Sequence, residues 1–161
     1  MNFKELNIIP PILRALEEEN YEVPTPIQEQ AIEPILEGRD LLACAQTGTG
    51  KTAAFAIPTI QLLYKNNKNA YNKSAKRKIR ALILAPTREL AIQIADSFKA
   101  YSKYINLKYG VVLGGVSQRT QEIMLRRGVD VLIATPGRLM DLMNQRLVKL
   151  DSVEIFILDE A

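Results

Sequence analysis

Short segments with apolar centres alternate with helical segments along this chain, and this alternation constrains the fold more than any other feature. Strands are predicted at 41–45, 79–85, 108–115, 129–135 and 153–158, and helices at 10–19, 26–38, from 50 onward, 87–105, 118–128 and 136–145. Strands that are apolar throughout are typical of parallel sheets whose two faces are both covered. The sequence therefore predicts an α/β fold, a three-layer parallel sheet with helices on both faces.

Polar or glycine-rich segments follow every predicted strand. AQTGTGKT follows the first strand, PTREL the second, a glycine pair the third, TPGR the fourth and DEA the fifth. In parallel α/β sheets, ligands bind beyond the carboxyl ends of the strands. We therefore expect the functional residues to meet at this one edge of the sheet.

The segment AQTGTGKT, residues 45–52, is typical of a phosphate-binding loop. Gly48 and Gly50 allow the tight turn that aims successive backbone N–H groups into one concavity, and the following helix adds its positive end. In such a loop Lys51 reaches the outer phosphates and the Thr52 hydroxyl binds Mg²⁺. Ala45 stands where the general motif has its first glycine, so a glycine turn without a ligand is the alternative. The predicted nucleotide-binding residues of this loop are Gln46, Thr47, Gly48, Thr49, Gly50, Lys51 and Thr52.

Two acids, Asp159 and Glu160, follow the last predicted strand. Mg²⁺ prefers one or two carboxylates together with water and phosphate oxygens, so Asp159 is a candidate metal ligand beside Thr52. Glu160 is a candidate for orienting and deprotonating the attacking water. Acids often simply end strands, but together with the phosphate loop they predict nucleotide hydrolysis. The predicted catalytic residues are Lys51, Asp159 and Glu160.

The composition excludes several classes of site. The 161 residues include no histidine and one cysteine, which excludes Ser-His-Asp triads, metal sites that need imidazole and an internal disulfide. The apolar runs are too short to span a bilayer, and the N-terminal MNFKEL does not resemble a signal peptide. A single cysteine fits a reducing cytoplasm, so we expect a cytoplasmic protein.

Much of the positive charge lies in one segment, residues 65–80. Removing the seven positive charges of this segment from the net charge of +3 leaves −4. Such a charge run is either a solvated loop or a contact with nucleic acid. Its basic residues are Lys65, Lys68, Lys73, Lys76, Arg77, Lys78 and Arg80.

The segment NYEVPTPIQ, residues 20–28, adds a further signal. Together with AQTGTGKT, PTREL, GG, TPGR and DEA, in this order, it resembles the DEAD-box RNA helicase family, close to bacterial helicases of the RhlE type. The resemblance covers essentially the whole chain, and this family commonly has alanine at the position of Ala45. It implies the N-terminal RecA-like P-loop NTPase domain of a helicase that binds ATP, Mg²⁺ and RNA.

The resemblance implies that NYEVPTPIQ is a Q motif, which binds adenine. Tyr21 stacks on adenine in this pattern, and Gln28 binds the adenine edge with an amide that both donates and accepts. Phe3 stands where the family has an upstream aromatic, and Thr25 belongs to the same motif. The family has glycine at the position of Asn20, and asparagine tolerates the left-handed conformation better than most residues. Without the flanking PTPI, Gln28 would be interpreted as an exposed helix residue.

The resemblance also implies RNA contacts at the loops after the second, third and fourth strands. Helix N-termini at Thr87 and Thr135 hold phosphates through backbone N–H groups, and Arg88 and Arg138 add charge. Contacts of this kind bind the RNA backbone with little sequence specificity, and the 2′-OH distinguishes RNA from DNA. Helix capping alone is the alternative for TPGR. The predicted RNA-binding residues are Pro86, Thr87, Arg88, Gly114, Gly115, Thr135, Pro136, Gly137 and Arg138.

The acidic motif of the family has four residues, and residues 159–161 provide three of them. The family's second RecA-like domain, which supplies arginine fingers and half of the RNA site, has no counterpart in these residues. We therefore expect a truncated domain, 1–161, of a longer helicase that locally unwinds RNA duplexes, and weak nucleotide binding with little activity for the domain alone. An unpaired sheet edge favours self-association. Two alternatives stay open: a DNA translocase with the same fold, and a catalytically silent RNA-binding or scaffold module. A GTPase is disfavoured, because NKNA and NKSA lack the aspartate of the guanine-binding Asn-Lys-x-Asp segment.

Overall fold

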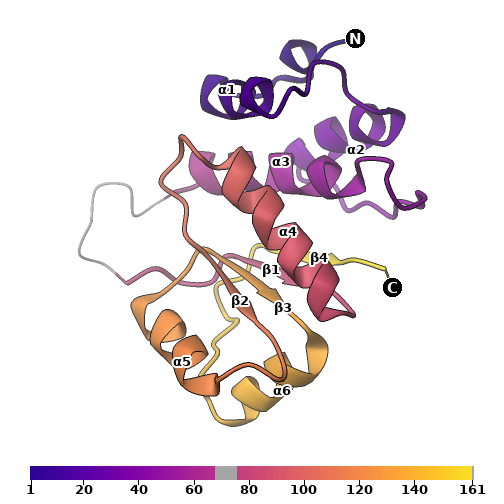
Figure 1. Ribbon diagram of the computed structural model, residues 1–161. Helices are drawn as coiled ribbons and strands as arrows, with labels where there is room; N and C mark the ends of the chain where they lie inside the picture. The colour runs from indigo at the N-terminus through magenta and orange to yellow at the C-terminus, as the bar shows by residue number, and fades with distance from the viewer. Residues whose placement is uncertain (68–75, 161) are drawn as a thin grey trace. The chain divides into compact units, whose positions relative to one another are not determined.

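The computed structural model describes residues 1–67 and 76–160, which form two compact units. Unit 1 comprises residues 1–66 and 97–106, and unit 2 comprises the described residues of 67–96 and 107–161. Figure 1 shows the helices and strands of the chain, coloured from indigo at the N-terminus to yellow at the C-terminus. Lys68 and Lys73 of the basic segment, and Ala161 of the acidic motif, lie outside the described residues.

Unit 1 is helical. Two of its α-helices begin with proline, whose fixed φ suits the first helical position. The second of these helices packs against the helix that follows the phosphate loop. The helices are η1 (Phe3–Leu6, a 3₁₀ helix), α1 (Pro10–Glu18), α2 (Pro26–Leu36) and α3 (Lys51–Lys65). The fully buried side chains of this unit include Ile12, Leu16, Ile32, Ile57 and Ile60.

Unit 2 is built on a four-stranded, wholly parallel sheet with the strand order β2-β3-β1-β4 (Figure 1). The strands are β1 (Ala81–Leu84), β2 (Tyr109–Val112), β3 (Val131–Ala134) and β4 (Ile155–Leu158). The strands are joined through α4 (Arg88–Tyr101), of which residues 97–101 belong to unit 1, α5 (Gln118–Arg127) and α6 (Pro136–Asn144). Parallel neighbours require crossover connections of this kind. The predicted α/β fold with a parallel sheet is confirmed.

The two central strands of the sheet, β1 and β3, are buried on both faces, whereas β4 is partly exposed. On one face, Leu82 of β1 and Leu132 of β3 belong to an apolar cluster that includes Leu125 of α5 and Leu142 of α6. Successive side chains of a strand point to opposite faces. Two-sided burial explains why these strands are apolar at every position instead of alternating. The residues of the opposite face that are also fully buried are Ala81, Ile83, Val131 and Ile133.

The strand predicted at residues 41–45 is wrong, because the structure gives this segment no regular secondary structure. Leu42 is 93% exposed and Leu41 is 45% exposed. The segment pairs with no described strand. A strand needs a neighbour to satisfy its backbone N–H and C=O groups, so apolar composition was not sufficient to form one. The sheet of the described residues therefore has four strands instead of the five predicted.

The predicted helices all form, with ends that differ from the prediction by a few residues. α4 begins at Arg88 and ends at Tyr101, whereas the sequence pattern extends from 87 to 105. α3 continues through Pro58 to Lys65. None of the helices within 1–67 and 76–160 is long and apolar enough to cross a lipid bilayer.

Candidate functional site

The phosphate loop has the backbone conformation that its glycines predict. Gly48 and Gly50 both have φ of 83°, in the left-handed region that favours glycine. Gly50 precedes the first turn of α3, which begins at Lys51. The hydroxyl of Thr49 donates a hydrogen bond of 2.6 Å to the carbonyl of Gln46, which closes the loop on itself. The backbone N–H groups at the start of α3 are therefore arranged as an anion site requires.

Gln28 connects the Q motif to the phosphate loop within unit 1. Its side chain is buried, at 5% exposure. Its Oε1 accepts from the backbone N–H of Thr25 at 2.9 Å, and its Nε2 donates to the carbonyl of Gly50 at 3.1 Å. A Cβ atom on Gly50 would lie 2.4 Å from that Nε2, so the amide can hold this position only against a glycine. The alternative interpretation of Gln28 as an exposed helix residue is therefore wrong.

The aromatic residues assigned to the adenine site differ in exposure. The ring of Tyr21 is 43% exposed and lies 6.1 Å, centroid to centroid, from the ring of Tyr101. Burial raises the pKa of the Tyr101 hydroxyl, so this side chain stays neutral. Asn20 has φ of 60°, as predicted for a position where the family has glycine. Phe3 is a core residue with 4% exposure, and its contact with adenine stays a prediction.

Unit 2 brings the loops after all four strands to the carboxyl edge of its sheet. The strand ladders continue past the strands: Ala85 N–H bonds the carbonyl of Ala134 at 3.0 Å, and Asp159 N–H bonds the carbonyl of Leu84 at 3.0 Å. Thr135 N–H likewise bonds the carbonyl of Val112 at 3.1 Å. The segments PTREL, GG and TPGR and the acid Asp159 therefore meet at one edge, as the sequence predicts.

Two arginines of these loops contact the glycine segment. The Nη1 of Arg138 donates to the carbonyl of Val116 and to Oε1 of Gln121, both at 3.1 Å. The Nη1 of Arg88 lies 3.0 Å from the point where a Cβ on Gly115 would stand. Gly115 has φ of 74°, so a side chain there would also strain the backbone. These contacts join PTREL, GG and TPGR into one cluster.

Gln121 is a residue of this cluster that the sequence did not reveal. It is buried, at 4% exposure, and its Nε2 donates to the carbonyl of Leu113 at 2.9 Å. Its Oε1 accepts from Arg138. Glutamine on a helix is usually a solvent-exposed residue. The one indication of its burial in the sequence is its position four residues before Leu125, on the apolar side of α5.

Helix capping explains one of the two threonines that precede helices, Thr87 of PTREL, and does not explain Thr135 of TPGR. The hydroxyl of Thr87 accepts from the N–H of Leu90 at 3.2 Å, as an N-cap residue does. α6 begins at Pro136, as a helix with proline at its first position does, but the side chain of Thr135 makes no capping hydrogen bond.

Asp159, at the end of β4, is buried, at 5% exposure, and the following Glu160 is exposed, with φ of 55°. Lys51 and Thr52 are half-buried at the start of α3 in unit 1. Among the described residues, no group of three or more His, Cys, Asp or Glu side chains is placed so that it could hold a metal ion. One carboxylate and one hydroxyl are the donor set that Mg²⁺ uses beside phosphate oxygens, so Asp159 and Thr52 fit this ion chemically. The joint site of loop and acids stays a prediction.

A glycine loop that opens a helix in one unit, and a wholly parallel sheet with the motif loops at its carboxyl edge in the other, define an α/β protein with a RecA-like fold. The chain belongs to the DEAD/DEAH box helicase family, whose model matches residues 25–161. The chain is 47% identical, over 99% of its length, to DEAD-box ATP-dependent RNA helicase 28 of Arabidopsis thaliana. It is 44% identical, over 99% of its length, to the ATP-dependent rRNA helicase RRP3 of Yarrowia lipolytica.

A solved structure has the same fold. The DEAD box protein from the hyperthermophile Methanococcus jannaschii superimposes with a TM-score of 0.85 and 38% sequence identity over 98% of this chain. The chain spans 41% of that protein, 20% of the Arabidopsis relative and 32% of the Yarrowia relative. The finer assignment to the RhlE type stays a prediction.

Proposed function

We propose that this chain is the ATP- and RNA-binding part of an ATP-dependent RNA helicase, which couples ATP hydrolysis to local unwinding of RNA duplexes. The single observation that carries the proposal is the gathering of PTREL, GG, TPGR and Asp159 at one sheet edge. Family membership and the names of the relatives, ATP-dependent RNA helicases, support it.

The nucleotide site uses residues of the Q motif, the phosphate loop and the acidic pair. Tyr21 packs on adenine, and the Gln28 amide, released from one of its present hydrogen bonds, binds the adenine edge. Lys51 neutralises the outer phosphates. Glu160 orients the attacking water and takes up its proton. Asp159 and the Thr52 hydroxyl would hold Mg²⁺, which would supply positive charge to the phosphate oxygens.

The RNA site uses the loops that unit 2 holds together. The N-terminal N–H groups of α4 and α6 bind RNA phosphates, and the two glycines at 114–115 allow the sugar–phosphate backbone to approach closely. Arg88 and Arg138 add positive charge while they hold the glycine segment. Because these groups contact the backbone, binding has little sequence specificity.

The remaining proposals concern the longer protein. A second RecA-like domain in the same chain completes the RNA site and supplies arginine fingers, which in related phosphoryl transfers contribute roughly 10³ to 10⁵ in rate. The 161 residues alone then bind adenine nucleotide weakly and show little RNA-stimulated hydrolysis. We propose a cytoplasmic protein on the basis of its single cysteine.

The test is a titration of the protein with fluorescent ADP and with fluorescent GDP. Gln28→Ala and Lys51→Ala should both weaken ADP binding, and Lys65→Ala, at the far end of the same helix, should leave it unchanged. Equal affinity for ADP and GDP would contradict the adenine assignment. Competition between RNA and DNA of the same sequence then separates an RNA helicase, which prefers RNA, from a DNA translocase.

A further inference from the structure

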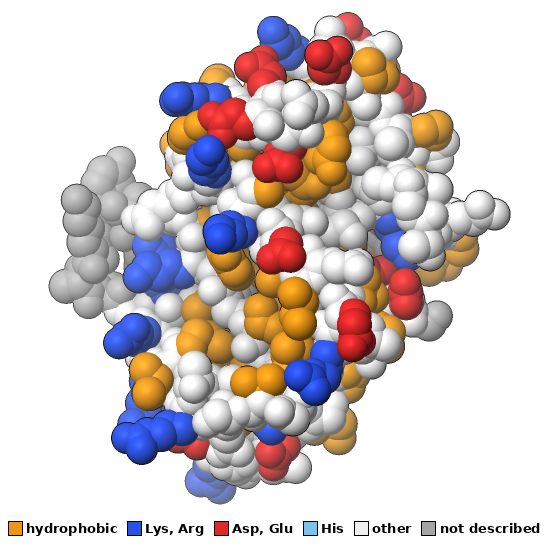
Figure 2. Space-filling model, viewed as in Figure 1, with side chains coloured by type: hydrophobic (Ala, Val, Ile, Leu, Met, Phe, Trp, Pro, Cys, Tyr) orange, Lys and Arg blue, Asp and Glu red, His pale blue; other side chains and the backbone are white. Residues whose placement is uncertain are grey.

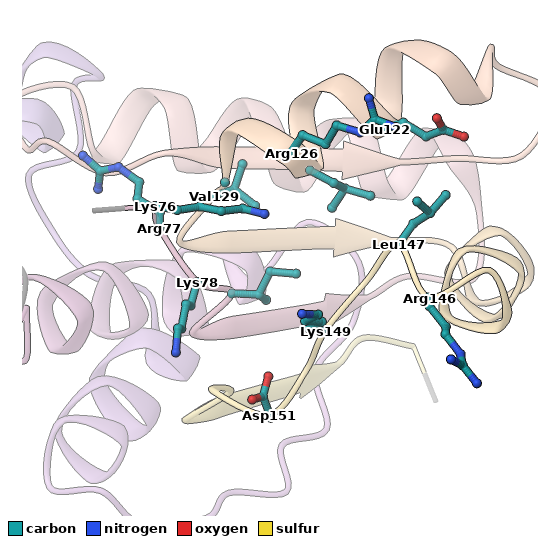
Figure 3. Close-up of a pocket in the computed structure, with 13 residues that line it drawn as sticks. Lys76, Arg77, Lys78, Glu122, Arg126, Val129, Arg146, Leu147, Lys149 and Asp151 are labelled. Atoms are coloured by element: carbon teal, nitrogen blue, oxygen red, sulfur yellow. The ribbon is translucent and has the colours of Figure 1, made fainter. Parts of the chain in front are cut away.

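Unit 2 contains a cavity of about 380 Å³ that no predicted site residue lines (Figure 3). Its walls are the segment that enters β1 (residues 76–79), the end of α5 with the following turn (122–129) and the chain after α6 (146–151). Residues 79 and 129 precede β1 and β3, so the cavity lies toward the amino ends of these strands. In a parallel sheet this edge is opposite the carboxyl edge that holds the predicted RNA loops. We call this cavity the amino-edge groove.

The amino-edge groove carries a concentrated positive charge. Two acids, Glu122 and Asp151, also line it, so its net charge is +4, larger than the +3 of the whole chain. Figure 2 shows Lys and Arg side chains gathered over the side of the molecule where α5 lies. Like charges at this density repel one another, and an anionic ligand relieves that repulsion. The cationic residues of the groove are Lys76, Arg77, Lys78, Arg126, Arg146 and Lys149.

Most of these cations are available to a ligand. Arg77 makes a salt bridge of 2.7 Å with Asp130. The other five lining cations make no ion pair with any residue in the described ranges 1–67 and 76–160. Lys78, Arg126 and Lys149 are exposed. Because these five cations form no ion pair within the described residues, ion pairing inside the fold does not explain why they lie together.

Hydrogen bonds of the buried Asp130 and a close backbone contact at Gly128 hold the walls of the groove in place. Asp130, at 3% exposure, accepts from Arg77 at 2.7 Å and from the N–H of Lys108 at 2.9 Å, and its carbonyl accepts from the N–H of Arg80 at 2.8 Å. Gly128 has φ of 89°, and a Cβ there would lie 2.6 Å from the carbonyl oxygen of Arg77. This close backbone contact holds the end of α5 against the entry to β1. The walls of the groove are therefore positioned before any ligand binds.

The floor of the groove is apolar. It includes Ile79 and Leu125, each at 8% exposure, Val129 at 4% and the half-buried Leu147. Ligand sites of small-molecule size have volumes of roughly 300–1,000 Å³ with apolar walls and a few polar groups. A cavity of about 380 Å³ with such a floor is large enough for one ribose or one base, and charged side chains stand at its rim.

We propose that the amino-edge groove is a second RNA-backbone site, which binds the RNA strand away from the motif loops. This inference rests on the proposed function, because it takes RNA as the ligand. Phosphates pair with the lysines and arginines, and ribose hydroxyls donate to the carboxylates of Glu122 and Asp151. An acidic protein segment fits less well, because it offers the two acids only N–H donors and brings no ribose or base to the apolar floor.

The test is RNA affinity measured by fluorescence anisotropy with labelled single-stranded oligouridylate at several salt concentrations. The double variant Arg126→Gln with Lys149→Gln removes two groove cations. Each phosphate contact contributes roughly 0.7 to the slope of log K against log salt for single strands, so we expect the slope to fall by about 1.4 and affinity to fall about twentyfold near ~0.1 M salt.

The matched control is Arg127→Gln with Lys108→Gln. These two residues are exposed, belong to the same unit and change the net charge equally, but they do not line the groove. Equal RNA affinity of the groove variant and the control variant would overturn the second site while the RNA helicase proposal stands. Absence of RNA binding by the unsubstituted protein would overturn both.

A second readout does not depend on affinity. RNA that carries 4-thiouridine should crosslink to peptides that contain residues 122–129 or 146–151, and mass spectrometry identifies these peptides. Crosslinks confined to the loops at the carboxyl edge would contradict the proposal. Binding of polyglutamate that the groove variant loses, without any RNA crosslink to residues 122–129 or 146–151, would instead assign the groove to an acidic protein partner and overturn the RNA site.

Discussion

At the scale of single residues, the phosphate loop depends on one close contact, between Gly50 and Gln28. The Gln28 amide holds the N-terminus of α2 through Thr25 and the loop through the carbonyl of Gly50. Both amide groups are used, so the residue assigned to adenine also shapes the phosphate loop. A change at Gly50 or Gln28 therefore acts on both the predicted adenine site and the phosphate loop.

Gly50→Ala should weaken both folding and nucleotide binding. The new Cβ would meet Gln28 Nε2 at 2.4 Å, and φ of 83° would strain any L-residue. Gly38→Ala is the matched control, because Gly38 has φ of 80° but no atom within 4 Å of its Cβ position. The control should lose about 1 kcal/mol of stability from the left-handed backbone alone. Thermal unfolding and ADP titration test this, and equal losses in the two variants would show that the Gln28 contact is unimportant.

Gln121→Ala should disturb the RNA loops. It leaves the carbonyl of Leu113 without its donor and removes one acceptor of Arg138. We expect a loss of about 1–3 kcal/mol in stability and weaker RNA binding. Gln118→Ala, one turn earlier on α5 and bonded only to Glu122 and Gln145 among the described residues, should change stability by less than about 0.5 kcal/mol. Urea unfolding and RNA anisotropy compare the two variants, and equal effects would contradict the positioning role.

At the scale of helices and strands, Asp130 joins the amino ends of three strands. It directly precedes β3, its carboxylate binds the N–H of Lys108 before β2, and it pairs with Arg77 before β1. Its Oδ1 also lies 3.7 Å from Nη1 of Arg80. Backbone bonds from Arg80 and Ala81 to the Asp130 carbonyl complete the junction. The amino edge of the sheet is thus held by one buried acid.

Asp130→Ala should be strongly destabilising. Removing one partner of a buried, hydrogen-bonded pair costs about 3–5 kcal/mol, and the value here should lie near ~3 kcal/mol because Arg77 is partly exposed. Asp151→Ala, at an exposed acid of the same unit, should be nearly neutral. Urea unfolding monitored by circular dichroism measures both variants. A small effect of Asp130→Ala would mean that the backbone bonds alone hold the three strand entries.

At the scale of the whole molecule, β4 is the strand whose environment differs most from the others. It pairs with β1 on one side and with no described strand on the other. Phe156 is 57% exposed and Leu158 is 54% exposed, although both belong to a wholly apolar strand. An apolar strand with a free edge favours pairing with another chain.

The chain should therefore self-associate through β4 in solution. Phe156→Lys places a charge on this strand and should lower the association, which analytical ultracentrifugation over a range of protein concentrations measures. Met140→Lys is the control, because Met140 is equally exposed, at 62%, but lies on α6. Association that persists in Phe156→Lys and disappears in Met140→Lys would assign the contact to the helix.

Much of the local structure follows from the sequence. The left-handed conformations of Gly48, Gly50 and Asn20 follow from turn chemistry, and the start of α2 at Pro26 follows from proline at a first helical position. The four paired strands follow from wholly apolar runs. Segment 41–45 has the same composition as those runs and is not a strand, because pairing depends on a neighbour that composition does not specify.

The sequence by itself determined the order of the elements, the parallel sheet and the motifs at the strand ends, because periodicity, turn residues and capping act within a few neighbouring residues. Only the tertiary structure decided that Gln28 is buried against Gly50, that Gln121 holds Arg138, and that three separate segments form the amino-edge groove. The reason is physical. Burial and hydrogen bonding between residues far apart in the chain depend on packing, and identical side chains, such as Gln28 and Gln118, acquire different environments from it.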